Sequence, residues 1–171
     1  VAIGDWVLDQ ACAQLAAWSV HPAAARLTIA VNVSAGQLHG SGFVERVRGI
    51  LERSGADPRR LKFELTESML VQDAEDMAGR IRTLREVGIG FALDDFGTGY
   101  SSLNYLRRLP LDQLKIDQSF VRDMLANPGA AGIVQAIVHL AASLGLDLVA
   151  EGVETAEQWQ HLRQIGCERF Q

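Results

Sequence analysis

Apolar and polar positions follow two alternating patterns along this chain. Short apolar, often β-branched runs typical of buried strands alternate with longer stretches whose apolar residues recur at helical spacing. The predicted strands cover residues 27–34, 61–66, 90–95, 113–117, 146–151 and 167–171. The predicted helices cover residues 4–19, 42–53, 73–87, 102–108, 129–144 and 155–165, with Thr155 as the N-cap of the last.

No low-complexity segment or interdomain linker interrupts this alternation of strand and helix, which predicts one domain with a parallel sheet and crossover helices. Two arrangements fit the pattern, a (βα)8 barrel and a doubly wound sheet. A complete (βα)8 barrel typically takes about 250 residues. This chain has 171, starts within a predicted helix and ends in a predicted strand, so we expect it to be part of a larger fold.

Composition narrows the class of protein. Hydrophobic residues make up 48% of the chain, enough for a substantial core. The net charge of -5 and the lack of a basic run argue against a nucleic-acid polymer or an anionic membrane as partner. Cys12 and Cys167 match neither a redox nor a zinc spacing. Because no signal peptide or membrane-length apolar run is present either, we expect a cytoplasmic protein with reduced thiols.

Charged or amide residues occur toward the C-terminal ends of five predicted strands. In parallel α/β folds these ends form one rim, where functional sites are built. A single such residue is more often a structural hydrogen-bonding group. Five on one rim favour a functional site, because burying each without a partner would cost several kcal/mol. They are Asn32, Glu64, Asp94 with Asp95, Lys115 and Glu151.

Asp94 and Asp95 are adjacent carboxylates at the end of an apolar run. Two buried acids side by side resist ionisation unless a cation neutralises them. A solvated turn that caps the next helix explains the pair equally well when it is taken alone. Together with the other rim oxygens, the pair favours magnesium, manganese or calcium. The following Gly97-Thr98-Gly99 lacks the third glycine of a dinucleotide-binding fingerprint, so we exclude that function.

Lys115 among acids suits phosphate chemistry, since an ammonium can balance charge that develops on a phosphoryl oxygen. A salt bridge inside a barrel is its other interpretation. Glu154 follows Glu151 by three residues and lies within reach of the same rim, although an acid there is also favoured by the dipole of the next helix. Two metals at this rim would clamp an in-line displacement at phosphorus. The pattern thus predicts a metal-dependent phosphoester hydrolase of undefined substrate.

Five motifs resemble the EAL domain family of cyclic di-GMP phosphodiesterases. They lie at residues 31–34 with 37–38, 64–68, 94–102, 114–117 and 150–155, and the likeness covers nearly the whole chain. The Asp-Asp-Phe-Gly-Thr-Gly-Tyr-Ser-Ser and Ala-Glu-Gly-Val-Glu-Thr runs are highly specific in combination. The resemblance implies a TIM-like (βα)8 barrel that hydrolyses cyclic di-GMP to linear pGpG with two magnesium or manganese ions, in bacterial second-messenger signalling.

The resemblance also implies roles for individual residues. Metal ligands would be Asn32, Glu64, Asp94 and Asp95, with Asp94 bridging the two ions. Lys115 would contact the metal-bound water or phosphate, with Asp117 as its partner. Glu151 would be a general base or metal-linked acid, and Glu154 a residue that contacts substrate or supports the site. Glu67 would anchor the loop of residues 96–102, which in the family couples the site to dimerisation. Gln171 would open the closing strand.

Two family features lie outside the chain. The Glu-Ala-Leu segment, which supplies a further metal ligand, would precede Val1 together with the first strands, and most of the closing strand would follow Gln171. We therefore expect residues 1–171 to be part of an EAL domain, in a homodimer and attached to sensor or GGDEF modules. A non-catalytic cyclic di-GMP receptor is the alternative, but degenerate members typically lose rim acids that this chain retains. An unrelated metal-dependent phosphoesterase is a third hypothesis.

Overall fold

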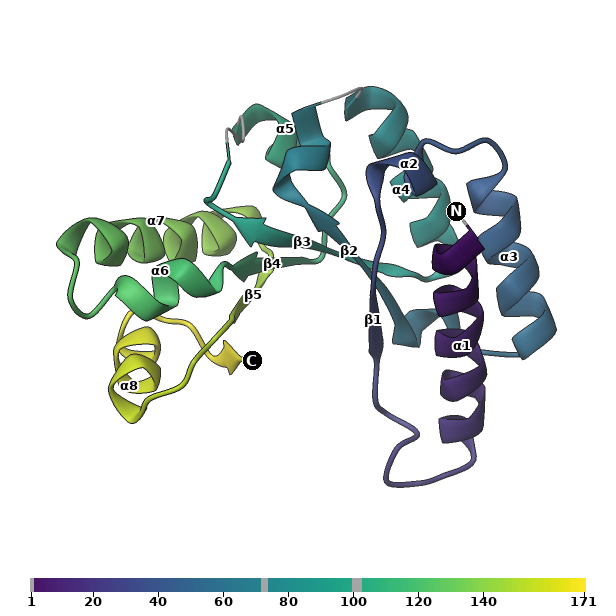
Figure 1. The fold of residues 1–171 in the computed structure, drawn as a ribbon, viewed down its shortest axis with the longest axis horizontal. Coiled ribbons are helices and arrows are strands. Elements are labelled where there is room, and N and C mark those ends of the chain that lie inside the picture. The colour runs from purple at the N-terminus through teal and green to yellow at the C-terminus, as the bar shows by residue number, and fades with distance from the viewer. Residues whose placement is uncertain (1, 72–73, 100–102) are drawn as a thin grey trace. The chain divides into compact units, whose positions relative to one another are not determined.

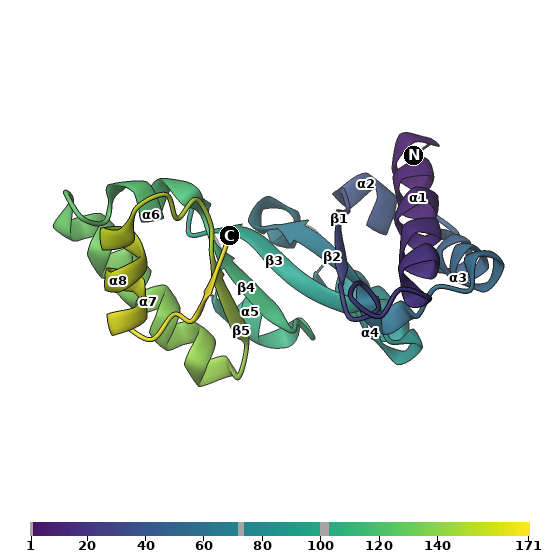
Figure 2. The same ribbon diagram turned by 90° about the horizontal axis from the view of Figure 1, so that it is seen from below.

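The computed structural model describes residues 2–71, 74–99 and 103–171 of the chain (Figures 1 and 2). The strands in this part are β1 (Ile29–Asn32), β2 (Leu61–Thr66), β3 (Gly90–Phe96), β4 (Gln113–Ile116), β5 (Asp147–Ala150) and β6 (Arg169–Phe170). The α-helices are α1 (Ala2–Ser19), α2 (Ala35–Leu38), α3 (Phe43–Ser54), α4 (Ala74–Val87), α5 (Leu103–Arg108), α6 (Gln118–Asp123), α7 (Pro128–Leu144) and α8 (Ala156–Gln164). Short 3-10 helices cover Pro58–Arg60 and Glu67–Val71.

The strands are hydrogen-bonded in chain order, from β1 to β6. The pairs β1 with β2, β3 with β4, β4 with β5 and β5 with β6 are all parallel. A doubly wound sheet reverses its strand order at a switch point, whereas a (βα)8 barrel adds each strand beside the preceding one. The observed order therefore confirms the barrel type of α/β fold and excludes the doubly wound alternative.

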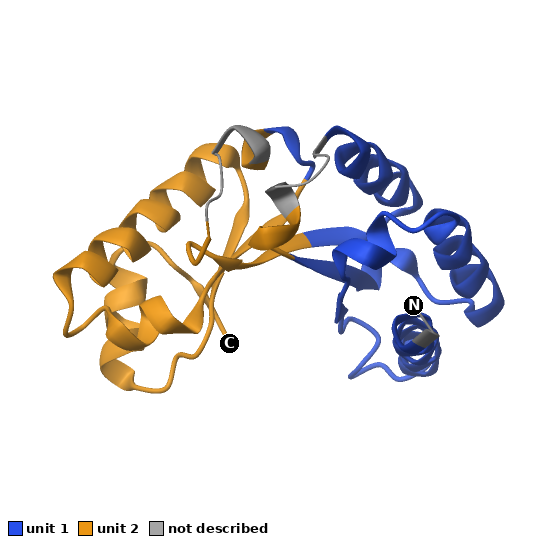
Figure 3. Ribbon diagram, turned by 45° about the horizontal axis from the view of Figure 1, so that its top comes forward, with its two compact units in different colours: residues 1–65, 72–91, 108–110 blue, residues 66–71, 92–107, 111–171 orange. Residues whose placement is uncertain are grey.

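The chain divides into two compact units (Figure 3). Unit 1 comprises residues 1–65, 72–91 and 108–110, and unit 2 comprises residues 66–71, 92–107 and 111–171. Strand β3 begins in unit 1 and continues into unit 2. The predicted site residues are divided between the units as well.

The core of unit 1 is organised around β2, whose side chains alternate between buried and half-buried. Phe63, on the buried face, is fully enclosed between Phe43 of α3 and Phe91 of β3, with ring centroids 6.1 and 5.6 Å away. The period of two that buries Phe63 turns Glu64 to the opposite face. Helix α1 packs against α3 and β1 in the same unit.

The core of unit 2 is built on β4, all four of whose residues are buried. A strand buried along its whole length is typical of parallel sheets covered by helices. Helix α7 packs against β4 and β5, and α6 packs against α7. Lys115, only 4% exposed, is held in this apolar setting.

Two predicted strands end earlier than expected because a side chain caps a helix that the apolar pattern did not reveal. Ser34 Oγ accepts a hydrogen bond from the Gln37 backbone N–H, and the Ser34 backbone N–H donates one to Gln37 Oε1, a capping box that begins α2. Asp117 is the N-cap of α6 and accepts from Ser119 N at 2.8 Å, so it is not the last strand residue. The predicted helix starts at Asp73 and Ser102 lie outside the described residues.

The remaining helices and strands agree with the predicted ones to within about two residues, the usual uncertainty of element ends. Thr155 caps α8 as predicted. In the described ranges, no helix combines the length and apolarity needed to cross a membrane.

Both cysteines are free and buried, which agrees with the expected reduced thiols. Burial, reinforced by Asp9, raises the pKa of the Cys12 thiol to about 11. Because the thiolate is the reactive form, Cys12 is a packing residue and not a nucleophile at neutral pH.

We predict that Phe63→Ala lowers the free energy of unfolding by about 3 to 5 kcal/mol, because it removes a fully buried ring from between two others. Denaturant unfolding measures the change, with Val20→Ala as a control at a side chain that is 76% exposed. Equal stability of the two variants would contradict this assignment of the core.

Candidate metal centre

The two adjacent aspartates are brought to one side of the chain by a bulge at the end of β3. Leu93 pairs with Leu114 and Phe96 pairs with Ile116, so three steps on β3 match two on β4. Asp95 takes the extra position with a φ of 54°, a left-handed conformation that aspartate tolerates better than most residues. Neighbouring residues of a regular strand point to opposite faces. The bulge removes that restriction.

Asp94 and Asp95 lie together with Glu151, the residue directly after β5. Each can offer a carboxylate oxygen, and these oxygens lie within 4.8 Å of one another. We call these three side chains the acidic cluster. Within unit 2, the ends of β3 and β5 thus contribute to one rim, as the sequence pattern predicts.

Lys115 of β4 connects two members of the acidic cluster. Its Nζ lies 3.2 Å from Asp94 Oδ1 and 2.5 Å from Glu151 Oε1. All three side chains are at least four-fifths buried, so these ion pairs are screened less than surface pairs are. One ammonium among three carboxylates leaves an excess of negative charge.

The excess negative charge contributes to a shift in the pKa of Asp95. Burial raises the pKa of its carboxyl group, and the neighbouring carboxylates of Asp94, Asp117 and Glu151 add to the effect. A hydrogen bond with Asp117 acts in the same direction. Asp117 itself is oriented by Ser119, whose backbone N–H and hydroxyl both donate to Oδ1. Ser119 is not among the predicted site residues, although the Asp-x-Ser spacing after β4 is a sequence signal for this contact.

The donor set of the acidic cluster fits a hard divalent cation. Carboxylate oxygens are the ligands that magnesium, manganese and calcium prefer, and neither nitrogen nor sulfur belongs to the cluster. Burial and then repulsion raise the pKa of Asp95, and a cation would offset the repulsion. A metal is predicted because neighbouring carboxylates need a cation to neutralise them, and these side chains meet that condition.

Glu67 holds the loop that follows the aspartates. Its carboxylate, in a side chain only 3% exposed, accepts hydrogen bonds from Gly97 N at 2.8 Å and Gly99 N at 3.1 Å. Charge-assisted bonds of this kind are about twice as strong as neutral ones. The loop's remaining motif residues, 100–102, lie outside the described residues. Coupling of this loop to dimerisation stays a prediction.

Asn32 and Glu64 form a neighbouring pair in unit 1. They are register partners, Asn32 as the last residue of β1 and Glu64 two residues before the end of β2. Asn32 is exposed, whereas Glu64 is half-buried. Their carboxamide and carboxylate occupy the strand ends where the sequence analysis predicted them, and their role as ligands stays a prediction.

Two further predicted residues of the described chain, Glu154 and Gln171, lie outside the acidic cluster. Glu154 is exposed in the loop after β5, and its backbone N–H donates to Gln158 Oε1. Gln171 continues the pairing beyond β6, since its N–H donates to Ala150 O and its carbonyl accepts from Val153 N. The roles predicted for Glu154 and Gln171 remain predictions.

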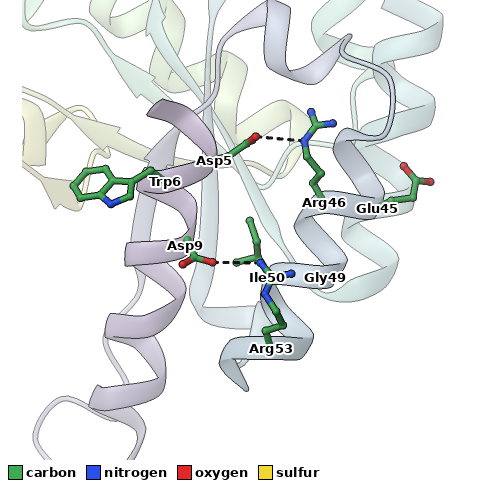
Figure 4. A pocket seen from close by; sticks show the side chains of 8 residues that line it. All are labelled: Asp5, Trp6, Asp9, Glu45, Arg46, Gly49, Ile50 and Arg53. Atoms are coloured by element: carbon green, nitrogen blue, oxygen red, sulfur yellow. Dashed lines mark hydrogen bonds and ion pairs between the residues drawn. The ribbon is translucent and has the colours of Figure 1, made fainter. Parts of the chain in front are cut away.

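A groove of about 570 Å³ between α1 and α3 is a separate feature of unit 1 (Figure 4). Two ion pairs cross it, Asp5 with Arg46 at 3.6 Å and Asp9 with Arg53 at 3.5 Å. Its lining includes none of the predicted site residues. We therefore assign the chemistry to the acidic cluster.

Comparison with known proteins decides the family. The family model of the EAL domain matches residues 1–171. The chain belongs to the EAL domain family. Among curated proteins, this EAL domain chain is 45% identical over 171 residues to MucR of Pseudomonas aeruginosa, a bifunctional diguanylate cyclase/cyclic di-GMP phosphodiesterase. The match covers 100% of this chain and 25% of MucR, so the chain spans about a quarter of that relative.

Solved EAL structures share the fold. The cyclic di-GMP complex of the PaMucR phosphodiesterase matches with a TM-score of 0.93 and 45% identity, covering 100% of this chain and 69% of that one. Klebsiella pneumoniae BlrP1, in a complex with calcium and cyclic di-GMP, matches with a TM-score of 0.86 and 30% identity, covering 98% of this chain and 42% of that one. The chain is thus a partial TIM-like barrel, as expected from the resemblance.

We predict that Asp95→Asn raises the melting temperature of the metal-free EAL domain at pH 7. The raised pKa means that ionised Asp95 costs stability above both its folded and its unfolded pKa. An amide removes that charge and can still donate to Asp117. The gain should shrink as the pH falls toward 3.8, the ordinary value for aspartate.

Thermal unfolding in chelator, followed from pH 7 downward, measures this effect. Asp123→Asn, at an exposed carboxylate on α6, is the matched control and should change little. An unchanged or lower melting temperature for Asp95→Asn at pH 7 would contradict the repulsion argument.

Proposed function

We propose that this chain provides the catalytic residues of a metal-dependent phosphodiesterase that hydrolyses cyclic di-GMP to linear pGpG. The observation that carries the proposal is the acidic cluster with Lys115 inserted between Asp94 and Glu151. Hard ligands and a buried cation are both suited to a phosphodiester. Cyclic di-GMP as substrate is supported by the phosphodiesterase function of MucR and by the ligand in the PaMucR complex.

The acidic cluster would hold magnesium or manganese through Asp94, Asp95 and Glu151. Asn32 and Glu64 keep the ligand roles that the family resemblance implies, and a second ion belongs to the same proposal. A bound divalent cation would polarise a phosphoryl oxygen and lower the pKa of a water molecule. Calcium in the BlrP1 complex supports a hard divalent ion.

Lys115 would stabilise negative charge on the reacting phosphate. Its ammonium is fixed by two carboxylates and is only 4% exposed, so it needs little reorganisation when charge develops nearby. Asp94 Oδ1 also accepts from the backbone N–H of Asp95 at 3.0 Å, which orients that carboxylate. Lys115 and Asp94 therefore act as fixed groups and not as proton carriers.

Glu151 is the group that we assign to proton transfer. Lys115 Nζ lies 2.5 Å from Glu151 Oε1, and the Glu151 carboxylate would take a proton from the attacking water. Glu154, exposed three residues later, would contact the substrate.

The assembly of the whole protein is part of the proposal. MucR is bifunctional and much longer than the matched segment, which supports attached signalling domains such as sensor or GGDEF modules. We propose that residues 1–171 form part of one EAL domain, whose remaining strands and Glu-Ala-Leu segment lie outside this chain. A homodimer and a cytoplasmic location complete the proposal.

A cyclic di-GMP receptor without catalysis is the second candidate. It is favoured by the cyclic di-GMP-bound state of the PaMucR structure, because binding alone would explain that complex. The intact set of Asp94, Asp95, Lys115 and Glu151 favours the enzyme, since a receptor has no need for so costly a cluster of charge.

Turnover distinguishes these functions. We expect cyclic di-GMP incubated with manganese to yield pGpG, detected by chromatography, when the chain is extended upstream by its native sequence. The 171-residue chain alone should be inactive, because it lacks the further ligand. Binding without turnover by the extended protein would favour the receptor. Failure to bind or cleave would refute cyclic di-GMP as ligand, and turnover of other phosphodiesters would then identify an unrelated phosphoesterase.

Asp94→Asn in the extended protein should abolish manganese binding and pGpG formation together while leaving the fold largely intact, because Asp94 contributes both to the acidic cluster and to the Lys115 ion pair. Calorimetric titration and circular dichroism follow the two effects separately. Turnover at the unsubstituted rate would refute the metal-site assignment.

A further inference from the structure

Gln158 is a buried polar side chain that the proposed reaction does not use. It lies in the first turn of α8 and is only 6% exposed. Its Oε1 accepts from the backbone N–H groups of Glu154 at 2.8 Å and Thr155 at 3.0 Å. Its Nε2 donates to the carbonyl oxygen of Val121 in α6 at 3.4 Å. The amide therefore bonds to two separate segments of backbone.

The first segment is the loop of residues 151–155, which joins β5 to α8 and begins with Glu151. At the start of the loop, Glu151 N donates to Ile116 O at 3.2 Å. Gly152 has a φ of +67°, and a Cβ atom there would lie 2.8 Å from Gln118 Cβ. The loop thus lies directly against the start of α6.

The second segment is α6, which follows the end of β4 without an intervening loop. Its N-cap is Asp117, two residues after Lys115. Val121, whose carbonyl oxygen accepts from Gln158, has a fully buried side chain. A displacement of α6 would therefore be transmitted to the end of β4 and to Lys115.

We propose that Gln158 is a positioning residue for the metal centre. By joining the loop after Glu151 to the helix after Lys115, its amide sets the separation of Glu151 from Lys115 and Asp94, and with it the spacing of the acidic cluster. This inference rests on the proposed function only in that the acidic cluster binds a divalent metal. It predicts that a side chain with no atom in the cluster controls metal affinity.

A purely structural role makes a different prediction. Thr155 and Gln158 form a capping box, in which Gln158 N donates to Thr155 Oγ1 at 3.2 Å. If capping were the whole role of Gln158, weakening the cap at either residue would have the same consequences. Thr155→Val removes the hydroxyl acceptor and leaves the Gln158 amide in place, so it is the matched control.

The test is a calorimetric titration of manganese into the full-length protein and its variants. Gln158→Leu keeps much of the volume but loses both the acceptor and the donor. We expect its affinity for manganese to fall by about 10-fold or more, the usual effect of losing a group that orients a metal ligand. Thr155→Val should lower the melting temperature and leave manganese affinity unchanged. Equal affinities in the two variants would overturn the proposal.

Gln158→Glu keeps the test decisive if the leucine variant does not fold. A carboxylate retains the acceptors for Glu154 and Thr155 N–H but cannot donate to Val121 O. We expect its manganese affinity to fall although the cap remains. Affinity equal to that of the unsubstituted protein would show that capping suffices and would also overturn the proposal.

The outcome does not depend on catalysis. Where cyclic di-GMP is hydrolysed, Gln158→Leu should lower kcat because it displaces reacting groups, and it should also raise KM because the released loop carries Glu154. If the unsubstituted protein binds manganese without turnover, the enzyme proposal fails while the affinity comparison still tests Gln158. If it binds no manganese, both proposals are refuted.

Discussion

Repulsion among half-buried carboxylates is the constraint on which the rest of this site depends. Asp94, Asp95 and Glu151 place oxygens within 4.8 Å of one another, and the single ammonium of Lys115 offsets only part of their charge. Burial, together with the repulsion that remains, raises the pKa of Asp95. A fold maintains such a cluster only when its backbone is held independently of the charges, and here a parallel sheet, a bulge and a buried glutamine supply that support.

The support is built from the ends of consecutive strands. Lys115 comes from β4, fully buried and paired on both sides, with β3 and β5 as its neighbours. The acids follow at the ends of those two strands, where regular pairing stops and side chains can converge. Packing of the sheet stabilises the fold against the repulsion among these carboxylates, and metal binding would reduce that repulsion at the cluster itself.

Sequence reasoning was most successful where burial dictates the pattern. The strands around Phe63 and Leu114 follow from apolar runs, and the strand-end positions of Glu64, Lys115 and Glu151 follow from their place in those runs. It was less successful with α2 and α6, whose few residues carry too little periodicity to outweigh the strand pattern before them. Their signals were the capping side chains of Ser34 and Asp117.

Sequence patterns do not predict the site features that depend on three-dimensional contacts. Nothing in the sequence indicates that Asp95 takes a left-handed conformation in a bulge, or that Gln158 reaches the carbonyl of Val121, 37 positions away. Glu67 is a partial exception, because family resemblance pointed to its contact with the loop after β3 while the bonds to Gly97 and Gly99 needed coordinates. Local pattern thus predicts which residues reach the rim, and tertiary packing determines how they are oriented.

The central claim is that the acidic cluster binds a hard divalent cation. Anomalous diffraction from crystals of the full-length protein grown with manganese tests it most directly. The account predicts a manganese peak coordinated by Asp94, Asp95 and Glu151, with Lys115 close by. Well-ordered side chains at the cluster without manganese, or manganese bound only elsewhere, such as at the acids of the groove between α1 and α3, would contradict it.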